Sequence, residues 1–153
     1  MAVEKEKLLQ KYSKAEAVLA TLTEGLSDIK DVEKLAACAQ TSPEKLYKTF
    51  PDSIVQCFEY TFDLTWKYVS EYLQFQGRTV EIKMPKSIFR ECLKAKLLYD
   101  AQVRLAIEMV DHRNLTTHGY DEKIIEEISK SIPEYRNLLE DILDITKPVI
   151  QKS

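Results

Sequence analysis

Only three glycines and five prolines interrupt the 153 residues of this chain. β-Sandwiches and β-barrels need many more turn residues, so this scarcity favours a protein of long helices. Hydrophobic residues make up 44% of the chain and charged residues 31%, which is enough apolar material to bury a core. The length is typical of one domain. We therefore expect an all-α fold and a single domain over residues 1–153.

Apolar residues recur at helical spacing along most of the chain. The strongest pattern covers residues 53–74, and its apolar side is wide enough for a central place in a bundle. Earlier helices are predicted over residues 3–24 and 29–39. Gly25 and Gly77 follow two of these segments, where a left-handed residue commonly ends a helix.

The second half of the chain continues the helical pattern after a loop over residues 78–84. Pro85 suits the first position of a helix, and Asp100 is the expected cap of the next one. The last apolar stripe contains Pro133, where we expect a kink or a restart. Pro148 is expected to close that helix.

Charge, cysteines and hydropathy exclude several classes of protein. The net charge of −3 excludes a chain that coats polyanions, so any nucleic-acid contact requires a local cationic patch. No apolar run reaches the roughly 20 residues that span a bilayer, and we expect a soluble, cytoplasmic protein without a membrane partner. Cys38, Cys57 and Cys92 are widely spaced, so we expect buried free thiols and neither a disulfide nor a metal site. No cofactor motif is found.

One stretch has the composition of a chemical site. Both histidines of the chain, His112 and His118, fall within seven positions, with Arg113 between them. On an unbroken helix Arg113 and His118 would point about 140° apart. They converge only if the helix ends between them or if the partners come from two copies of the chain. Short hydroxyl residues and a glycine follow, which makes a helix end plausible.

These residue types suit phosphodiester cleavage without a metal. Arginine is a permanent cation whose planar fork matches two phosphate oxygens. Histidine can hold or release a proton near neutral pH. Asn114 can add a neutral hydrogen-bond donor, and His112 is a further polar candidate.

The spacing alone also allows a purely structural interpretation. Arg113 can interact with the carbonyls at a helix end or pair with Asp111 or Asp121. His118 can be an ordinary turn histidine. Glu59 lies one position off the main apolar stripe and either pairs with Arg113 across the bundle or faces water.

Three further segments of the sequence, in a fixed order around the motif, resemble a known family. The chain reads FEYTFDLTWKYVSEYL over residues 58–73, MPKSIFRECLKAKLL over 84–98, and IEMVDHRN followed by LTTHGYDE over 107–122. This order resembles the HEPN family, and in particular the group known as nucleotidyltransferase substrate-binding proteins. The resemblance covers roughly residues 52–128.

The resemblance implies an up-and-down antiparallel bundle of four to six helices that forms a homodimer. The family's Arg-x4-His-x-Tyr motif matches Arg113, His118 and Tyr120. In HEPN toxins two such motifs meet at the dimer axis and cut RNA without metal, with Arg113 and His118 at the matching catalytic positions. A partner minimal nucleotidyltransferase attaches AMP to the tyrosine matching Tyr120 and silences the toxin. A bulky anion two residues from His118 would repel RNA phosphates.

Three positions depart from the family pattern. Met84 stands where a serine cap is usual, and Lys96 stands where a glycine is common; both concern helix ends. Asp63 replaces the more usual glutamate, which leaves open whether it has a polar role near the site.

Three functions remain open at this point. The first is a dimeric ribonuclease toxin held off by its nucleotidyltransferase. The second is a binding subunit that holds a nucleotide or another substrate for the transferase and does no chemistry. The third is a helical assembly factor without a site, in which Arg113 and His118 lie far from any cleft.

Overall fold

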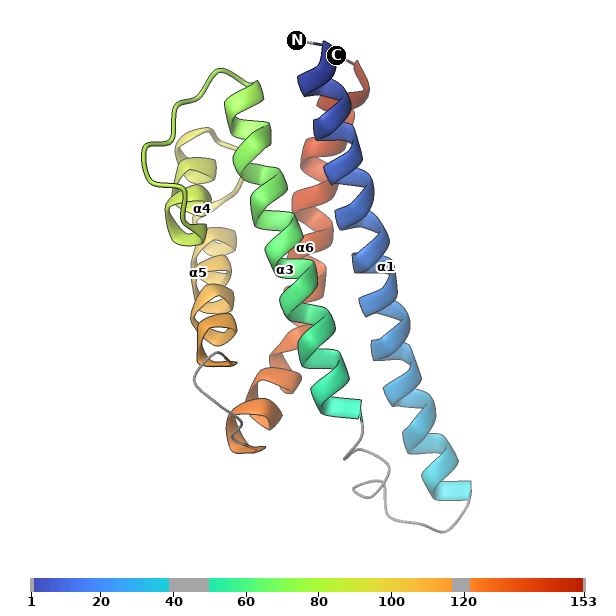
Figure 1. The fold of residues 1–153 in the computed structure, drawn as a ribbon. Coiled ribbons are helices and arrows are strands. Elements are labelled where there is room, and N and C mark those ends of the chain that lie inside the picture. The colour runs from blue at the N-terminus through green and yellow to red at the C-terminus, as the bar shows by residue number, and fades with distance from the viewer. Residues whose placement is uncertain (1, 39–49, 117–121, 153) are drawn as a thin grey trace.

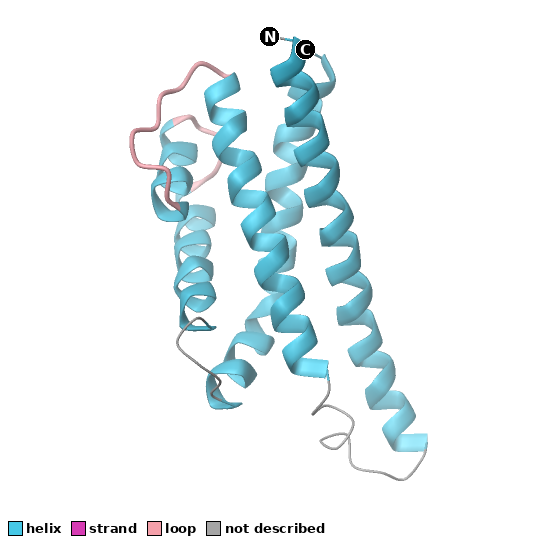
Figure 2. Cartoon of the chain, in the orientation of Figure 1, coloured by secondary structure: helices cyan, strands magenta, loops and turns pink. Residues whose placement is uncertain are grey.

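The computed structural model describes the backbone of residues 2–38, 50–116 and 122–152, and the side chains of 5–27, 54–116 and 123–147. Figure 2 shows helices and connecting loops in these ranges, with no strand among them. The predicted all-α fold is therefore confirmed. Five helices are described: α1 (Ala2–Cys38), α3 (Phe50–Phe75), α4 (Pro85–Lys94), α5 (Asp100–Leu115) and α6 (Glu122–Lys152).

The long helices alternate in direction, as an up-and-down bundle requires. In Figure 1, α1 and α5 run downward, whereas α3 and α6 run upward. Helix α3 occupies the middle and packs against α1, α4 and α6. The short α4 and the adjoining α5 lie on the side of α3 that faces away from α1. The segment with the widest apolar stripe thus holds the central position that its sequence predicted.

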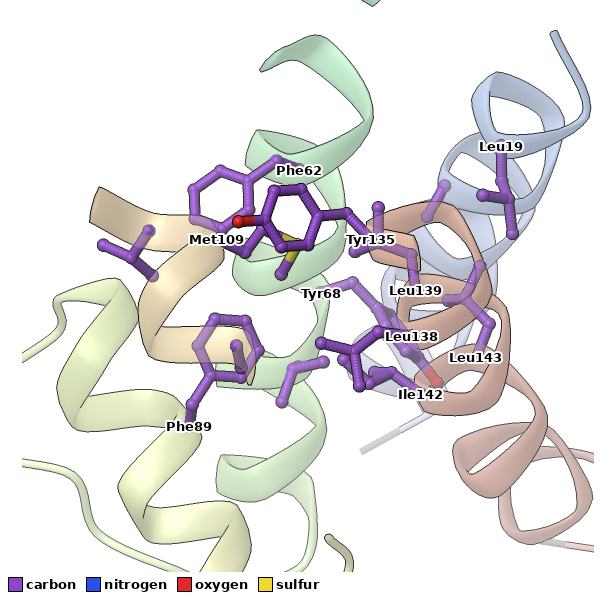
Figure 3. Packing of buried hydrophobic residues seen from close by; sticks show 14 of the residues in the cluster. Leu19, Phe62, Tyr68, Phe89, Met109, Tyr135, Leu138, Leu139, Ile142 and Leu143 are labelled. Carbon is purple, nitrogen blue, oxygen red and sulfur yellow. The ribbon is translucent and has the colours of Figure 1, made fainter. Parts of the chain in front are cut away.

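One continuous core joins the helices, and aromatic rings fill its centre. Phe58 and Phe62 of α3 are fully buried, and Phe58 stacks on Tyr135 of α6 with ring centroids 5.6 Å apart. Figure 3 shows Tyr135 reaching from α6 toward Phe62 and Met109, so that one side chain links three helices. Trp66 is only partly buried and packs against the edge of this core.

Two helices end in the same hydrogen-bonded turn, the Schellman motif. At the end of α3, Gly77 has φ +83° and Arg78 N–H donates to Leu73 O, which confirms the predicted role of Gly77. At the end of α4, Lys96 takes the same place with φ +61°, and Leu97 N–H donates to Cys92 O. A lysine therefore occupies a left-handed position that favours glycine.

Gly25 does not end a helix, contrary to the sequence prediction. Helix α1 runs without a break from Ala2 to Cys38, so the two helices expected at 3–24 and 29–39 are one. A Cβ atom at Gly25 would lie 2.8 Å from Ile54 Cδ1 of α3. The glycine therefore permits close packing of α1 on α3 rather than a left-handed turn.

Two further helix boundaries differ from the prediction. The N-cap of α5 is Tyr99, whose backbone N–H donates to Gln102 Oε1 at 2.9 Å, and Asp100 is the first helical residue, paired with Arg104 at 2.8 Å. Pro148 does not close α6, which continues to Lys152. A proline removes one helical hydrogen bond, and packing of the residues before it can hold the helix together.

Pro133 lies within α6 on an exposed surface, and the helix passes through it. Figure 1 shows α6 bending between its orange start and its red remainder, as the predicted kink requires. Buried Ile132 and Tyr135 on either side anchor the bend to the core.

Met84 is the N-cap of α4, with extended backbone angles and no side-chain cap, and Pro85 follows it as predicted. Cys92 is buried and free, whereas Cys57 is free and only partly buried. Burial raises the pKa of the Cys92 thiol to about 12. The side chain of Cys38 lies outside the described residues. Within the described part of the chain, no helix is long and apolar enough to cross a membrane.

Candidate functional site

Arg113 lies on the last turn of α5, where the helix ends. Leu115 is the last helical residue and Thr116 is the C-cap, so the helix stops before His118. The Thr116 hydroxyl donates to the backbone oxygen of Arg113 at 2.7 Å, and Arg113 Nη1 donates to the same hydroxyl at 3.3 Å. The first of the two conditions for convergence of Arg113 and His118, a helix end between them, is therefore met.

Two carboxylates of α3 hold the guanidinium from the other side. Arg113 Nη2 donates to Asp63 Oδ2 at 3.2 Å, and Nη1 lies 3.5 Å from Glu59 Oε2. Glu59 and Asp63 stand four residues apart, which places them one above the other on one face of α3. Of the two alternatives for Glu59, the ion pair is the one found, and Asp63 has the polar role that its sequence left open.

Burial makes this cluster more than a surface ion pair. The Arg113 side chain is 19% exposed, Glu59 27% and Asp63 36%. Among the described residues the buried Nε of Arg113 has no hydrogen-bond partner. Two carboxylates against one guanidinium leave the described cluster with an excess of one negative charge. A phosphate that approaches Arg113 must therefore compete with Glu59 and Asp63.

The structure also shows which groups the other polar residues near the motif contact. Asp111 pairs with Lys86 at 2.7 Å, so it is not the partner of Arg113. His112 points toward the core, where its Nδ1 shares a hydrogen bond with the Tyr135 hydroxyl and the two ring centroids are 5.6 Å apart. Burial raises the pKa of Tyr135 above its ordinary value, with nearby Glu108 adding to the effect.

His112 therefore links α5 to α6 and lies away from the Arg113 cluster, because neighbouring helical positions point about 100° apart. Asn114 is exposed at the end of α5. The predicted His118 and Tyr120 fall in residues 117–121, which lie outside the described residues, as does Asp121. Of the predicted site residues, the structure brings Arg113 and Glu59 together.

Asp63 and Thr116 complete this cluster, and sequence spacing did not single them out as partners of Arg113. Asp63 lies 50 positions before Arg113 in the chain. Helical spacing could have indicated this contact. Glu59 and Asp63 lie on one face of a helix, so an arginine that pairs with Glu59 can also reach Asp63. In the described residues, no group of histidine, cysteine and acidic side chains is arranged to hold a metal ion.

A comparison with known protein families shows which family the chain belongs to. The family model of nucleotidyltransferase substrate binding protein-like chains matches residues 9–147. The chain belongs to this family. The match extends over nearly the whole sequence and includes α3, the Arg113 cluster and the segment with His118.

A solved structure supports the relationship. The chain is similar to a protein from Thermus thermophilus whose crystal structure is known, with 35% sequence identity and a TM-score of 0.67. The alignment covers 87% of this chain and 98% of that one. No curated protein matches the sequence. The family and the helical bundle are thus shown, and the family's description associates such chains with a nucleotidyltransferase.

Proposed function

We propose that this chain is the toxin of a toxin–antitoxin pair, a metal-independent endoribonuclease that acts in a cleft between two copies of the chain. The observation that carries the proposal is the setting of Arg113. It is a largely buried arginine, fixed by Glu59, Asp63 and Thr116 at a helix end, and His118 follows five positions later. A merely solvated surface arginine has no such set of partners.

The chemistry assigns a separate task to each residue. The 2′-hydroxyl of the RNA attacks the adjacent phosphorus, the new P–O2′ bond forms, and the bond to the 5′ oxygen breaks. One copy of His118 accepts the proton of the 2′-hydroxyl, and the copy in the second subunit gives a proton to the leaving 5′ oxygen. Arg113 stabilises the charge that develops on the phosphate oxygens, which is often the largest contribution to catalysis.

The carboxylates of α3 have a positioning role in this scheme. An arginine with several rotatable bonds loses considerable entropy when it is held in one geometry. Glu59 and Asp63 hold the guanidinium before RNA arrives, so less of that cost falls on substrate binding.

The first prediction concerns His118. Removing its imidazole in His118→Ala should lower the rate of RNA cleavage by at least about 100-fold, since a positioned acid–base group is typically worth that much. The measurement is cleavage of a single-stranded oligoribonucleotide in EDTA. Lys130→Ala, which changes an exposed side chain of α6, is the control purified in the same way. Equal cutting by the wild type and His118→Ala would show a contaminating nuclease and would contradict the proposal.

The second prediction concerns Tyr120. With ATP and the nucleotidyltransferase partner, the Tyr120 phenol oxygen attacks the α-phosphorus and pyrophosphate leaves. The modified protein should gain the mass of AMP on the peptide that contains Tyr120 and should lose its ribonuclease activity. Tyr120→Phe should stay unmodified and active. Modification elsewhere, or full activity of the modified protein, contradicts this control mechanism.

A second candidate function is a binding subunit that presents a nucleotide to the transferase and does no chemistry. The net charge of −3 favours it, because a long RNA carries many more negative charges than one nucleotide and must overcome a larger repulsion. Calorimetry with ATP and AMP separates the two: saturable nucleotide binding without cleavage of any RNA in EDTA supports the binding subunit.

A further inference from the structure

A net negative chain that acts on RNA requires a local cationic surface, and the Arg113 cluster does not supply it. The net charge of the chain is −3, and Arg113 faces two carboxylates. RNA binding depends mainly on the number of cations that meet its phosphates. The attraction for the strand must therefore come from another part of the molecule, and the surface along α3 is a candidate.

Two adjoining hollows lie along the C-terminal half of α3, and both are lined in part by the loop over residues 78–84. Figure 1 shows this loop at the upper left. The volumes of the hollows are about 450 and about 200 Å³, and both are lined by Gln74 and Lys83. We name them together the α3 groove. Lys11 of α1 borders one hollow and Arg78 borders the other.

The α3 groove is strongly cationic. Lys11, Lys67, Arg78 and Lys83 line it, whereas Glu71 is the single carboxylate among its described lining residues. Lys11 pairs with Glu71, and Arg78 pairs with Glu91 at 2.8 Å. Lys67 and Lys83 are exposed and have no ion pair within the described residues. Two lysines are thus available for phosphates.

An aromatic side chain completes the groove. Trp66 is the only tryptophan of the chain, and it is partly buried, whereas Phe58 and Phe62 on the same helix are fully buried. It lines the smaller hollow together with Lys67 and Ser70. Single-stranded nucleic acids are bound by cations that follow the backbone and by aromatic rings that stack on bases. The α3 groove provides both.

The groove continues the face of α3 that holds Arg113. Asp63, Lys67, Ser70 and Gln74 follow one another at spacings of four, three and four, which places them on one side of a helix. From Asp63 to Gln74 the helix rises about 16 Å. A strand laid along this face passes from the Arg113 cluster directly into the groove.

We infer that the α3 groove is the binding track for a single RNA strand, with Lys67 and Lys83 on its phosphates and Trp66 against a base. This inference rests on the proposed ribonuclease function and names how that site holds its substrate. The groove supplies affinity, and the Arg113 cluster supplies chemistry. A net negative protein then needs no general positive charge to engage RNA.

The test compares two double variants with the same change of charge. His118→Ala serves as the background so that the RNA stays intact. Lys67→Glu with Lys83→Glu reverses the charge of two groove lysines, whereas Arg104→Glu with Lys130→Glu reverses two exposed cations that line neither hollow. Binding of a fluorescent single-stranded oligoribonucleotide is followed by anisotropy across a range of salt. Urea unfolding confirms that each variant folds.

Reversing the charge of the two groove lysines should raise the dissociation constant for RNA by at least about tenfold. The slope of the logarithm of the binding constant against the logarithm of the salt concentration should fall in magnitude by about 1.4, since each phosphate contact of a single strand contributes about 0.7. The control pair should change the dissociation constant by less than about threefold, because neither residue lines the groove and salt screens exposed charges that do not contact the strand. Emission of Trp66 should change saturably on RNA addition to the His118→Ala protein and should not change in the groove variant.

Each other outcome overturns the inference. Equal weakening by both double variants would show an effect of total charge, and constant Trp66 emission during RNA binding would place the strand elsewhere. If the Lys67→Glu, Lys83→Glu protein with native His118 still binds and cuts RNA normally, the groove inference fails while the proposed function stands. If the wild-type protein neither binds nor cuts RNA, the proposed function fails first and the inference falls with it.

Discussion

The state of Arg113 decides what this site can do. Its side chain is 19% exposed and its guanidinium is shared between Glu59 and Asp63, so the cation is fixed in place but partly neutralised. A fixed arginine is ready to receive a phosphate, whereas a neutralised one attracts it weakly. The balance between these effects can be measured by removing one charge without removing the hydrogen bond.

Asp63→Asn makes this change, because the amide oxygen still accepts from Arg113 while the negative charge is gone. We expect the dissociation constant for RNA to fall two- to fivefold, which corresponds to the ~0.5–1 kcal/mol of a partly exposed ion pair. The measurement is anisotropy in the His118→Ala background. Asp141→Asn, at an exposed position of α6, is the matched control and should bind like its parent. Weaker binding by Asp63→Asn would contradict this expectation and would show that the fixed geometry of Arg113 matters more for binding than its neutralisation.

At the residue scale, the sequence indicated the chemical character of the site residues but predicted their contacts only in part. The expectation that Arg113 binds phosphate follows from its chemistry alone. Its pairing with Glu59 was one of two alternatives, because helical periodicity gives the direction of a side chain within its own helix and not the rotation of the next helix. His112 looked equally polar in the sequence, yet it bonds to Tyr135 in the interior, across 23 positions of chain.

At the scale of helices, the interiors were predictable and the ends were less so. The wide stripe of α3 and the cap role of Gly77 follow from periodicity and from the left-handed preference of glycine. Gly25 carries the same local signal, but α1 continues through it, and a Cβ there would lie 2.8 Å from Ile54 Cδ1 of α3. Local sequence does not distinguish a glycine that ends a helix from one that admits a neighbouring helix.

Lys96 offers a test of this reasoning about helix ends. Its φ of +61° costs an L-residue roughly 1–2 kcal/mol, and glycine avoids this cost but loses more entropy on folding. Lys96→Gly should therefore raise the free energy of unfolding by about 0.5–1 kcal/mol in urea titrations.

Gly77→Ala is the counterpart, because Gly77 has the same turn and φ +83°, and nothing lies within 4 Å of an added Cβ. It should lower the free energy of unfolding by about 1 kcal/mol through the backbone alone. A Lys96→Gly protein less stable than the wild type would show that the Lys96 side chain contributes more than its strained backbone costs.

At the scale of the whole molecule, α3 organises both the core and the candidate site. Its buried face carries Phe58 and Phe62, and another face carries Glu59, Asp63 and the residues of the α3 groove. The order of the helices and their alternation could be predicted from the family resemblance. The groove could not, because it joins Lys11 of α1 to Lys83 of a loop, and only the folded arrangement brings them together.

The central claim is that two copies of the motif act together in one cleft, and mixed dimers test it most directly. Wild-type and His118→Ala chains are unfolded together, refolded at varying ratios, and assayed for RNA cleavage in EDTA, with subunit exchange confirmed by native mass spectrometry. If both motifs are required, activity follows the square of the wild-type fraction, so an equal mixture has about a quarter of full activity. A linear fall to about half would show that each chain acts by itself and would contradict the claim.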